Sequence, residues 1–549
     1  MSMLLFFSFV IAMFVTMVLI PPLKAKALEM DFLDVPDDRK VHTTPIPRIG
    51  GIAMVIGALL PVVMWARQSQ EIVAFLIGAG VILTFGVWDD RRTLDYKIKF
   101  GGQILAVAVV VLWGGVKIYY APFFALDPIP EWVAVPLTFF ALLGITNAIN
   151  LADGLDGLAG GTTLISLAAI CILAYMAGDF RLTLVGLAII GSIIGFLRFN
   201  THPAQIFMGD GGSQFLGFSV GVLVIILTQQ TNPTLSPGMP LLLLGLPIID
   251  TFIVMGQRIL ERRSPFSPDK NHIHHKLLDL GFDHYEAVIV IYLLQGGLVG
   301  SAFAFRYYSD LFNMSLFATV FVAAIFAFPL AVRTKLHLKE RRGSIRPTKT
   351  TRLVQHLRET GVLYRYPYYF ISATLPVYAA VTVFRAQTMA KDIVALALVL
   401  AGLMAILTVL FRNLTISFLE RGLIYITVTL VAYCSYSVTD AAQHPTFENA
   451  YFVGLAISVA LSFRFSSLRS LELTPLDFLV IVLALTVPNV PGLTIPVEHF
   501  GVLVAKVFTL FYAAEVLINS RLSVPLALRI AMTCLLALTA IHGAANTVA

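Results

Sequence analysis

Residues 132–176 read WVAVPLTFFALLGITNAINLADGLDGLAGGTTLISLAAICILAYM, with a polar stretch between two long apolar runs. That stretch carries two asparagines and two aspartates at intervals of three residues, Asn147, Asn150, Asp153 and Asp156. Apolar runs of about 18 to 21 residues are long enough to cross a bilayer as α-helices, and such runs recur from end to end of the chain. The sequence therefore predicts an all-α fold, a polytopic bundle of transmembrane helices.

The composition supports a membrane protein and argues against several other classes. Of the 549 residues, 58% are hydrophobic and 13% are charged, whereas a soluble domain averages about 25% charged residues. The apolar runs are continuous rather than alternating, which argues against a β-barrel. The three cysteines fall within or at the ends of apolar runs, which argues against a disulfide framework or a thiolate metal site. The net charge of +6 comes without an aromatic and basic binding pattern, so no nucleic-acid partner is expected.

The positions of Lys and Arg give the expected topology. The first run has no leading Lys or Arg, unlike a signal peptide, and Lys24 and Lys26 follow it. Positive charge gathers on the cytoplasmic side, so the N-terminus is expected outside. The inward loops before residue 332 then hold fifteen Lys and Arg, and the outward loops hold four. This bias supports eleven helices, at 3–23, 47–65, 71–88, 102–119, 132–150, 158–176, 181–198, 213–229, 239–257, 286–305 and 311–331.

A basic, hydrophilic stretch at 332–365 marks the clearest domain boundary. We therefore expect a membrane domain at 1–335, a basic cytoplasmic linker at 336–365, and an additional membrane domain of unknown function at 366–549. About seven further apolar segments lie beyond the linker, near 367–384, 392–411, 421–438, 449–464, 477–493, 499–518 and 523–541. This odd number would leave the C-terminus outside.

Most Asp, Asn and His residues of the first part lie in five segments on the predicted cytoplasmic side. The outward loops are short and chemically plain. A structural membrane protein has no need of this asymmetry, whereas an enzyme with a soluble substrate does. The five segments are DVPDDRKVHTTPIPRIGG (34–51), DDRRTLDYK (89–97), NAINLADGLDGL (147–158), FNTHPAQIFMGDGGS (199–213) and SPDKNHIHHKL (267–277).

These side chains suit a polyanion bound with a divalent cation. Mg²⁺ prefers oxygen ligands and commonly takes one or two carboxylates with substrate phosphates. Asp210 is expected in a flexible glycine turn, MGDGGS, where backbone N–H groups can also reach a diphosphate. Ser213 is expected to cap the next helix. Asp89 and Asp90 are adjacent carboxylates that repel each other unless a cation is near.

The string HIHH at 272–275 raises zinc as an alternative, but zinc needs ligands that converge on one point. His272 and His275 can share a helical face, which His274 is not expected to join. A proton or phosphate contact is the preferred interpretation. Lys40, His42 and Arg48 suit a phosphate-binding role, and their alternative is ordinary topogenic charge.

Together, in this order and on one face, the five segments resemble the polyprenyl-phosphate N-acetylhexosamine-1-phosphate transferase family. These are the WecA-like and MraY-like bacterial membrane enzymes, and the resemblance covers about residues 1–335. It implies ten or eleven helices and transfer of a sugar-1-phosphate from a UDP-sugar to a lipid phosphate, with release of UMP. It also implies a Mg²⁺ cofactor, with Mn²⁺ as the alternative ion. The string HIHH is closer to the N-acetylglucosamine branch than to the peptidoglycan-precursor branch, which has three consecutive histidines.

The resemblance implies roles for individual residues. Asp210 matches a Mg²⁺ ligand and Asn150 a second ligand, while Phe207 matches a position that stacks on uracil. The expected catalytic residues are Asp89 and Asp90 near the lipid phosphate, Asp153 and Asp156 in the nucleotide-sugar site, and His274. The expected substrate-binding residues are Asn147, Phe207, Lys40, His42, Arg48, Lys99, His272 and His275.

The expected partners are a UDP-N-acetylhexosamine, undecaprenyl phosphate and the lipid bilayer. The expected location is the bacterial inner (plasma) membrane, with the site on the cytoplasmic face. The sugar, the polysaccharide pathway and the oligomeric state stay open, with a homodimer as one alternative. A transporter is a rival reading, although transporter sites usually lie near the midplane on repeated, broken helices. A non-catalytic scaffold that kept the fold is the other rival.

Overall fold

The computed structural model of the chain describes residues 2–27, 29–34, 45–122, 128–264, 271–333, 362–386, 389, 391–410, 418–437, 445–465, 475, 479, 500–519 and 525–546. These residues are almost entirely helical. The only sheet among them is an antiparallel pair, β1 (Leu33–Asp34) with β2 (Ile46–Pro47). Eleven of the described helices are long and apolar enough to cross a membrane. The predicted all-α polytopic fold is confirmed.

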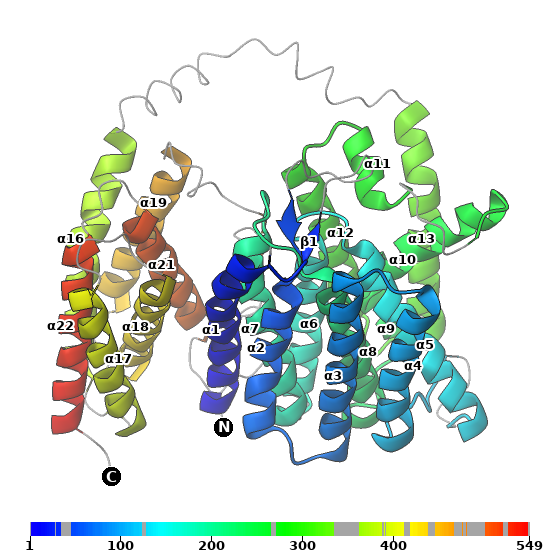
Figure 1. Cartoon of the computed structure of the whole chain (residues 1–549), viewed down its shortest axis with the longest axis horizontal. Helices are drawn as coiled ribbons and strands as arrows, with labels where there is room; N and C mark the ends of the chain where they lie inside the picture. The colour runs from blue at the N-terminus through cyan, green and yellow to red at the C-terminus, as the bar shows by residue number, and fades with distance from the viewer. Residues whose placement is uncertain are drawn as a thin grey trace. The chain divides into compact units, whose positions relative to one another are not determined.

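The chain divides into two compact units, of which the first contains both strands and the helices up to residue 333 (Figure 1). Two of its helices continue as short π-helices, η1 (Val109–Trp113) after α4 and η2 (Leu227–Thr231) after α8. The helices are α1 (Ser2–Lys26), α2 (Gly50–Trp65), α3 (Gln70–Arg91), α4 (Tyr96–Ala108), α5 (Glu131–Ala152), α6 (Leu158–Met176), α7 (Phe180–Asn200), α8 (Gly209–Ile226), α9 (Met239–Leu243), α10 (Gly245–Leu260), α11 (Ile273–Asp279), α12 (His284–Ala304) and α13 (Asp310–Arg333).

The second unit contains the helices after residue 361. Its interior includes an ion pair between Glu420 and Arg529, both fully buried. Lys506 also pairs with Glu448, which accepts hydrogen bonds from Tyr378 and Ser435. The helices are α16 (Val362–Arg385), α17 (Lys391–Leu410), α18 (Phe418–Ser437), α19 (Pro445–Phe465), α21 (Phe500–Asn519) and α22 (Pro525–Ala545).

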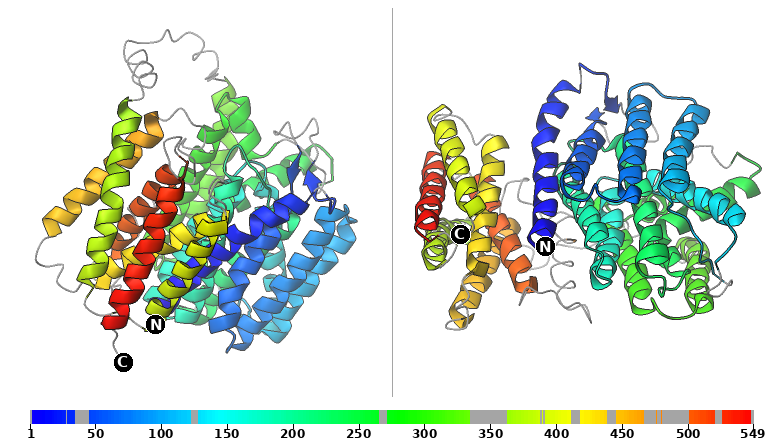
Figure 2. Two further views of the ribbon diagram at one scale, coloured as in Figure 1. Left: turned by 60° about the vertical axis from the view of Figure 1, so that its left-hand side comes forward. Right: turned by 90° about the horizontal axis from the view of Figure 1, so that it is seen from below.

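Helix α8 forms the centre of the first unit. The membrane-length segment Gly209–Thr231 is buried inside the protein, and α8 packs against α2, α3, α5 and α6. The long helices of this unit lie side by side in the views of Figure 2. A helix buried on all sides needs small residues where its neighbours approach closely. A Cβ added at Gly86 of α3 would lie 2.3 Å from the Gly211 Cα of α8.

Replacing Gly86 by alanine is therefore expected to force α3 and α8 apart. We expect the first unit to lose about 1–3 kcal/mol of stability, as overpacked cores do. Thermal unfolding in detergent would measure the change. Gly80→Ala on the same helix is the matched control, because a Cβ there meets nothing within 4 Å. Equal melting temperatures for the two variants would contradict the close packing of α3 and α8.

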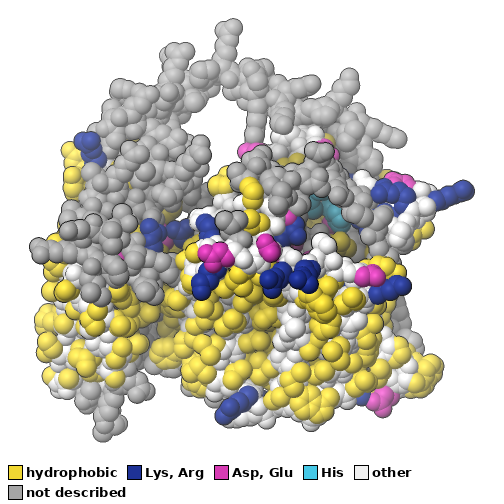
Figure 3. All heavy atoms as spheres, in the orientation of Figure 1, with side chains coloured by type: hydrophobic (Ala, Val, Ile, Leu, Met, Phe, Trp, Pro, Cys, Tyr) yellow, Lys and Arg dark blue, Asp and Glu magenta, His cyan; other side chains and the backbone are white. Residues whose placement is uncertain are grey.

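The polar residues of the predicted site gather at one end of the bundle of the first unit. Helices α3 and α5 end there, and α4, α6 and α8 begin there, at the end where β1 is labelled in Figure 1. The space-filling view shows charged side chains in a band at this end, above a broad apolar surface (Figure 3). This distribution is the one expected for a membrane-embedded bundle with its polar site at one interface.

All eleven segments predicted before residue 332 contain a helix, but the segment predicted at 102–119 is helical only as far as Trp113, and another segment is interrupted. The predicted helix 239–257 divides into α9 and α10 at Leu244. Pro247 has no N–H to donate to the Leu243 carbonyl, one helical turn earlier. That carbonyl instead accepts hydrogen bonds of 2.8 Å from Ser166 and Gln295. Six of the seven later segments are helical, and the seventh, 477–493, lies almost wholly outside the described residues.

Candidate active site

The carboxylate of Asp210 lies at the centre of the polar end of the first unit. One of its oxygens accepts a hydrogen bond of 2.7 Å from the amide of Asn150 on α5. The other lies 2.5 Å from Lys99 Nζ on α4. Lys99 also lies 3.0 Å from Asp89 at the end of α3. Four predicted site residues from four helices thus meet around one carboxylate.

Asp90 holds the beginning of α8 rather than pointing at the same cluster as Asp89. Its two oxygens accept hydrogen bonds from the backbone N–H groups of Asp210 (2.7 Å) and Gly211 (3.1 Å). These are among the N–H groups that an α-helix leaves unsatisfied at its N-terminus. Glycine at position 209 permits this approach because it has no Cβ. Its φ is 67°, and a Cβ there would lie 2.4 Å from an Asp90 oxygen, so another residue would clash.

Two sequence expectations about this helix start are wrong. Asp210 lies in the first turn of α8 rather than in a flexible loop, because the helix already begins at Gly209. Ser213 does not cap α8, since it lies inside the helix and donates to the Gly209 carbonyl (2.9 Å). Its hydroxyl also accepts from the amide of Asn150 (2.7 Å). The capping group is supplied by Asp90 from a different helix.

Asp153 and Asp156 follow the end of α5. Burial raises the pKa of the Asp153 carboxyl to about 7, and the charges of Asp210 and Asp156 act in the same direction. Burial also acts to raise the pKa of Asp156, but the hydrogen bonds from His202 and Ala204 and the charges of the two histidines, His284 and His202, together outweigh burial and lower it. Asp156 is therefore ionised at neutral pH, whereas Asp153 lies close to its midpoint.

Arg48 and Phe207 border the same end of the bundle. The guanidinium of Arg48 pairs with Asp34, and its charge also acts on the carboxyl of Asp153. The backbone of Phe207 is fixed by hydrogen bonds with Pro47 (2.7 Å) and Gly50 (2.9 Å). Lys40 and His42, two further predicted substrate-binding residues, lie outside the described residues.

The three histidines of HIHH lie close together, and His274 contacts the stretch between Asp153 and Asp156. His274 packs against Gly154, where a Cβ would lie 2.2 Å from its Nε2. Burial lowers the pKa of the His274 imidazole to about 3, with the charge of His275 acting in the same direction. His274 is therefore neutral at neutral pH and offers a hydrogen bond rather than a charge.

The expectation that His274 cannot join the other two histidines is wrong. His272 precedes the first turn of α11 with an extended backbone, so helical spacing does not apply to it. The ring of His274 stacks with that of His272 at 5.7 Å and lies 4.3 Å from that of His275. Asp250 of α10 holds this arrangement by accepting hydrogen bonds from His272 and Ile273, both 2.8 Å.

Asn147 lies one turn before Asn150 and joins a separate amide network. Its amide donates to Gln103 of α4 (2.8 Å), which in turn donates to Gln214 of α8 (2.9 Å). Both glutamines are buried. The structure therefore places Asn147 among helix-to-helix contacts, next to the cluster around Asp210.

Several polar residues at this end were not singled out from the sequence. Asp250 carried a usable signal, because a lone carboxylate inside an apolar helix is expensive and generally has a partner. His202 stands inside the quoted segment 199–213, but it bears no motif of its own. His284 had no signal, because it stands at a helix start, as many surface histidines do. Only the folded chain brings His202, His284 and Asp156 together.

The donor set fits a hard divalent cation. Asp89, Asp90 and Asp153 all interact with the charge of Asp210. Two permanent cations act on these carboxylates: Lys99 on Asp89 and Asp210, and Arg48 on Asp90 and Asp153. Oxygen ligands with surplus negative charge are what Mg²⁺ prefers. Rotation of the Asn150 amide would exchange its nitrogen for its oxygen, which would then face a cation held by Asp210.

Comparison with known proteins identifies the family. Glycosyl transferase family 4 matches residues 72–228. A probable undecaprenyl-phosphate N-acetylglucosaminyl 1-phosphate transferase of Bacillus subtilis is 37% identical over 335 residues, which are 60% of this chain and 92% of that protein. The undecaprenyl-phosphate α-N-acetylglucosaminyl 1-phosphate transferase of Escherichia coli is 30% identical over 315 residues, 56% of this chain and 85% of that protein.

A decaprenyl-phosphate N-acetylglucosaminephosphotransferase of Mycobacterium leprae is 35% identical over 301 residues, 49% of this chain and 76% of that protein. The matched family segment contains Asp89, Asp210 and the polar stretch at 147–161. The chain therefore belongs to glycosyl transferase family 4 and is a membrane-embedded transferase.

Proposed function

We propose that the protein transfers N-acetylglucosamine-1-phosphate, or a related N-acetylhexosamine-1-phosphate, from a UDP-sugar to undecaprenyl phosphate and releases UMP. The observation that carries this proposal is the cluster of Asp210, Asn150, Lys99 and Asp89 at one end of an apolar bundle. Such a site can receive a soluble diphosphate from water and a lipid phosphate from the bilayer. The names of the relatives support both substrates.

In this proposal an oxygen of the lipid phosphate attacks the sugar-linked phosphorus of the donor. A new P–O bond forms there, the P–O bond to the UMP oxygen breaks, and UMP leaves with the electron pair. Transfer of this kind depends mainly on positioning and electrostatic stabilisation. Lys99 contacts the phosphates, and Asp89 orients the lipid phosphate or accepts its remaining proton.

Asp210 and Asn150 would hold Mg²⁺. When bound, the ion neutralises the diphosphate and the charge that develops on the leaving UMP. Phe207 and Asp156 would contact the nucleotide, and Arg48 and His274 would border the sugar phosphate. We place the protein in the bacterial inner membrane with this site facing the cytoplasm, where positive charge is expected to gather. The charged band in Figure 3 supports that orientation.

Purified protein incubated with UDP-N-acetylglucosamine, undecaprenyl phosphate and Mg²⁺ tests the proposal. We expect UMP and lipid-linked sugar diphosphate in equal amounts, with no product after EDTA treatment. Parallel reactions with other UDP-N-acetylhexosamines would identify the preferred sugar. Uptake of UDP-sugar into vesicles without UMP release would instead identify a transporter. If the protein showed neither uptake nor UMP release, it would be a non-catalytic scaffold.

We also propose that residues 1–335 are sufficient for transfer, with 336–365 as a linker and 366–549 as an additional domain. The cluster around Asp210 belongs wholly to the first compact unit. A chain ending at Ile345 is therefore expected to retain most of its turnover in the UMP-release assay. Asp210→Ala in the shortened chain is the matched control for background release. A folded but inactive shortened chain would show that the second unit contributes to the chemistry.

A further inference from the structure

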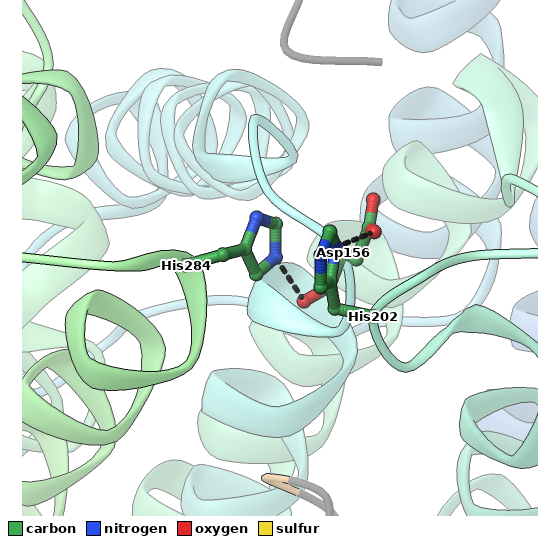
Figure 4. A group of neighbouring side chains, drawn as sticks. All are labelled: Asp156, His202 and His284. Carbon is green, nitrogen blue, oxygen red and sulfur yellow. Dashed lines mark hydrogen bonds and ion pairs between the residues drawn. The ribbon is translucent and has the colours of Figure 1, made fainter. Parts of the chain in front are cut away.

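A second cluster lies beside the carboxylates, where three separate segments meet at Asp156, His202 and His284 (Figure 4). Asp156 lies between α5 and α6, His202 lies between α7 and α8, and His284 begins α12. One oxygen of Asp156, Oδ2, accepts hydrogen bonds from His202 Nδ1 (2.7 Å) and from the backbone of Ala204 (3.0 Å). The proposed function gives no role to either histidine.

The three side chains are close enough to suggest a metal site, but the ring geometry argues against one. The imidazoles of His202 and His284 stack at 4.0 Å with their planes 19° apart. A bound metal lies near the plane of each ligating ring at about 2.0–2.1 Å from its nitrogen. One ion cannot satisfy two nearly parallel rings stacked at this distance. The arrangement is instead a hydrogen-bonded stack.

The two imidazoles hold Asp156 from two directions. His202 donates to its carboxylate, and His284 Nε2 lies 3.4 Å from its backbone carbonyl. Within the described part of the chain, the two hydrogen bonds that the Asp156 carboxylate accepts, from His202 and from the backbone N–H of Ala204, both fall on Oδ2. Oδ1 therefore remains to accept a hydrogen bond from a ligand. His202 thus sets the direction in which an ionised carboxylate presents its second oxygen.

His202 is also the anchor of the segment that leads to Phe207 and Asp210. Its carbonyl accepts a hydrogen bond of 2.7 Å from the hydroxyl of Tyr285, two residues into α12. At the other end of the segment, Phe207 is fixed to Pro47 and Gly50. A single residue therefore couples the position of Asp156 to the segment that carries Phe207.

We propose that His202, supported by His284, is a positioning residue of the donor subsite. It fixes Asp156 Oδ1 and the segment 201–208 so that they contact one ligand, the nucleoside part of a nucleoside-diphosphate sugar. This class of ligand carries N–H and O–H donors for the carboxylate and a flat base for Phe207. The inference rests on the proposed function for the identity of the donor, and it adds residues that set donor affinity.

Two substitutions of His202 separate this role from simple structural support. The amide nitrogen of asparagine can replace Nδ1, whereas that of glutamine reaches the position of Nε2 and leaves Asp156 without its donor. His202→Gln is expected to raise the KM for UDP-N-acetylglucosamine about tenfold, the effect of one hydrogen bond to a charged group. His202→Asn is expected to stay close to wild type. Neither variant should change the KM for undecaprenyl phosphate.

Binding of UDP-N-acetylglucosamine by calorimetry in Mg²⁺, without acceptor, provides a readout independent of turnover. We expect the same order of affinities: wild type, then His202→Asn, then His202→Gln. His284→Phe keeps the stacked ring but loses the contact with the Asp156 carbonyl, and it is expected to weaken binding less than His202→Gln. Melting temperatures would show whether each variant is folded.

Three results would overturn the inference. Equal affinities for the Asn and Gln variants would mean that the donor to Asp156 is irrelevant. A parallel rise in the KM for undecaprenyl phosphate would indicate general disruption. Tight Zn²⁺ binding abolished by His202→Gln would indicate a metal site after all. A wild-type protein that binds UDP-N-acetylglucosamine but does not turn it over would contradict the proposed function and leave the inference to be decided by binding.

Discussion

Asp210→Ala is expected to reduce UMP release about a thousandfold while the protein stays folded. Asp210 carries the contacts to Asn150 and Lys99 that join α5 and α4 to the start of α8. Its carboxylate is the group best placed to hold the divalent ion, so its loss removes charge stabilisation from the transferring phosphate. The measurement is UMP release under saturating substrates and Mg²⁺, with melting temperature recorded for the same sample.

The control for Asp210→Ala is another carboxylate at the opposite end of the bundle. Glu131 begins α5, about 30 Å along that helix from the site, and its side chain is 67% exposed where it pairs with Lys117. Glu131→Gln is expected to leave turnover unchanged. Near-normal turnover by a folded Asp210→Ala variant in Mg²⁺ would show that Asp210 does not hold the metal ion. Raised Mn²⁺ that restored the alanine variant would point to a different ligand set.

The sequence predicts the helices of this protein well because membrane insertion leaves a strong signal. A run such as Leu158–Met176 is apolar over its full length, and few structures other than a spanning helix can satisfy its backbone. The sequence also predicts that the five polar segments lie on one face of the membrane, because the number of Lys and Arg residues in each loop indicates on which side the loop lies. The interruption at Leu244 is not visible in this way, because it depends on the side chains of Ser166 and Gln295 from other helices.

The sequence predicts which residues form the site but not which partner each of them contacts. Asp89 and Asp90 are adjacent in the sequence and look equivalent. The end of α3 directs one toward Lys99 and the other toward the N-terminus of α8. Asn147 and Asn150 likewise share a motif, yet Asn147 faces Gln103 while Asn150 faces Asp210. The partner of each side chain depends on how separate helices pack against one another. The spacing of residues in the sequence does not give this information.

The same limit explains why His202 and His284 went unrecognised. They are 82 residues apart, and neither is spaced from Asp156 at an interval typical of a ligand set. Their stacking requires α12 to begin beside the segment that follows α7. A cluster assembled from two loops and the start of a helix leaves no local pattern in the sequence. Its members are found only once the fold has placed the loops.

Asp90→Asn is expected to lower turnover about a hundredfold by displacing Asp210, because small misplacements of reacting groups carry effects of this size. The carboxylate accepts from two backbone N–H groups at once. An asparagine can offer only one accepting oxygen, so its NH₂ group would oppose one of those donors. The negative charge that favours a helix N-terminus is also lost. The variant should therefore need more Mg²⁺ for half-maximal activity than the wild type.

The Mg²⁺ requirement separates positioning from direct catalysis. If Asp90 were the base that accepts a proton, Asp90→Asn would change the pH profile and leave the Mg²⁺ requirement alone. Asp95→Asn is the matched control, because Asp95 caps α4 by accepting a hydrogen bond from the backbone N–H of Lys97, and asparagine caps helices as well as aspartate does. That variant should behave like wild type in both measurements. A shifted Mg²⁺ requirement in Asp90→Asn alone would mean that the second carboxylate of the pair acts by holding α8, and through it Asp210, in place.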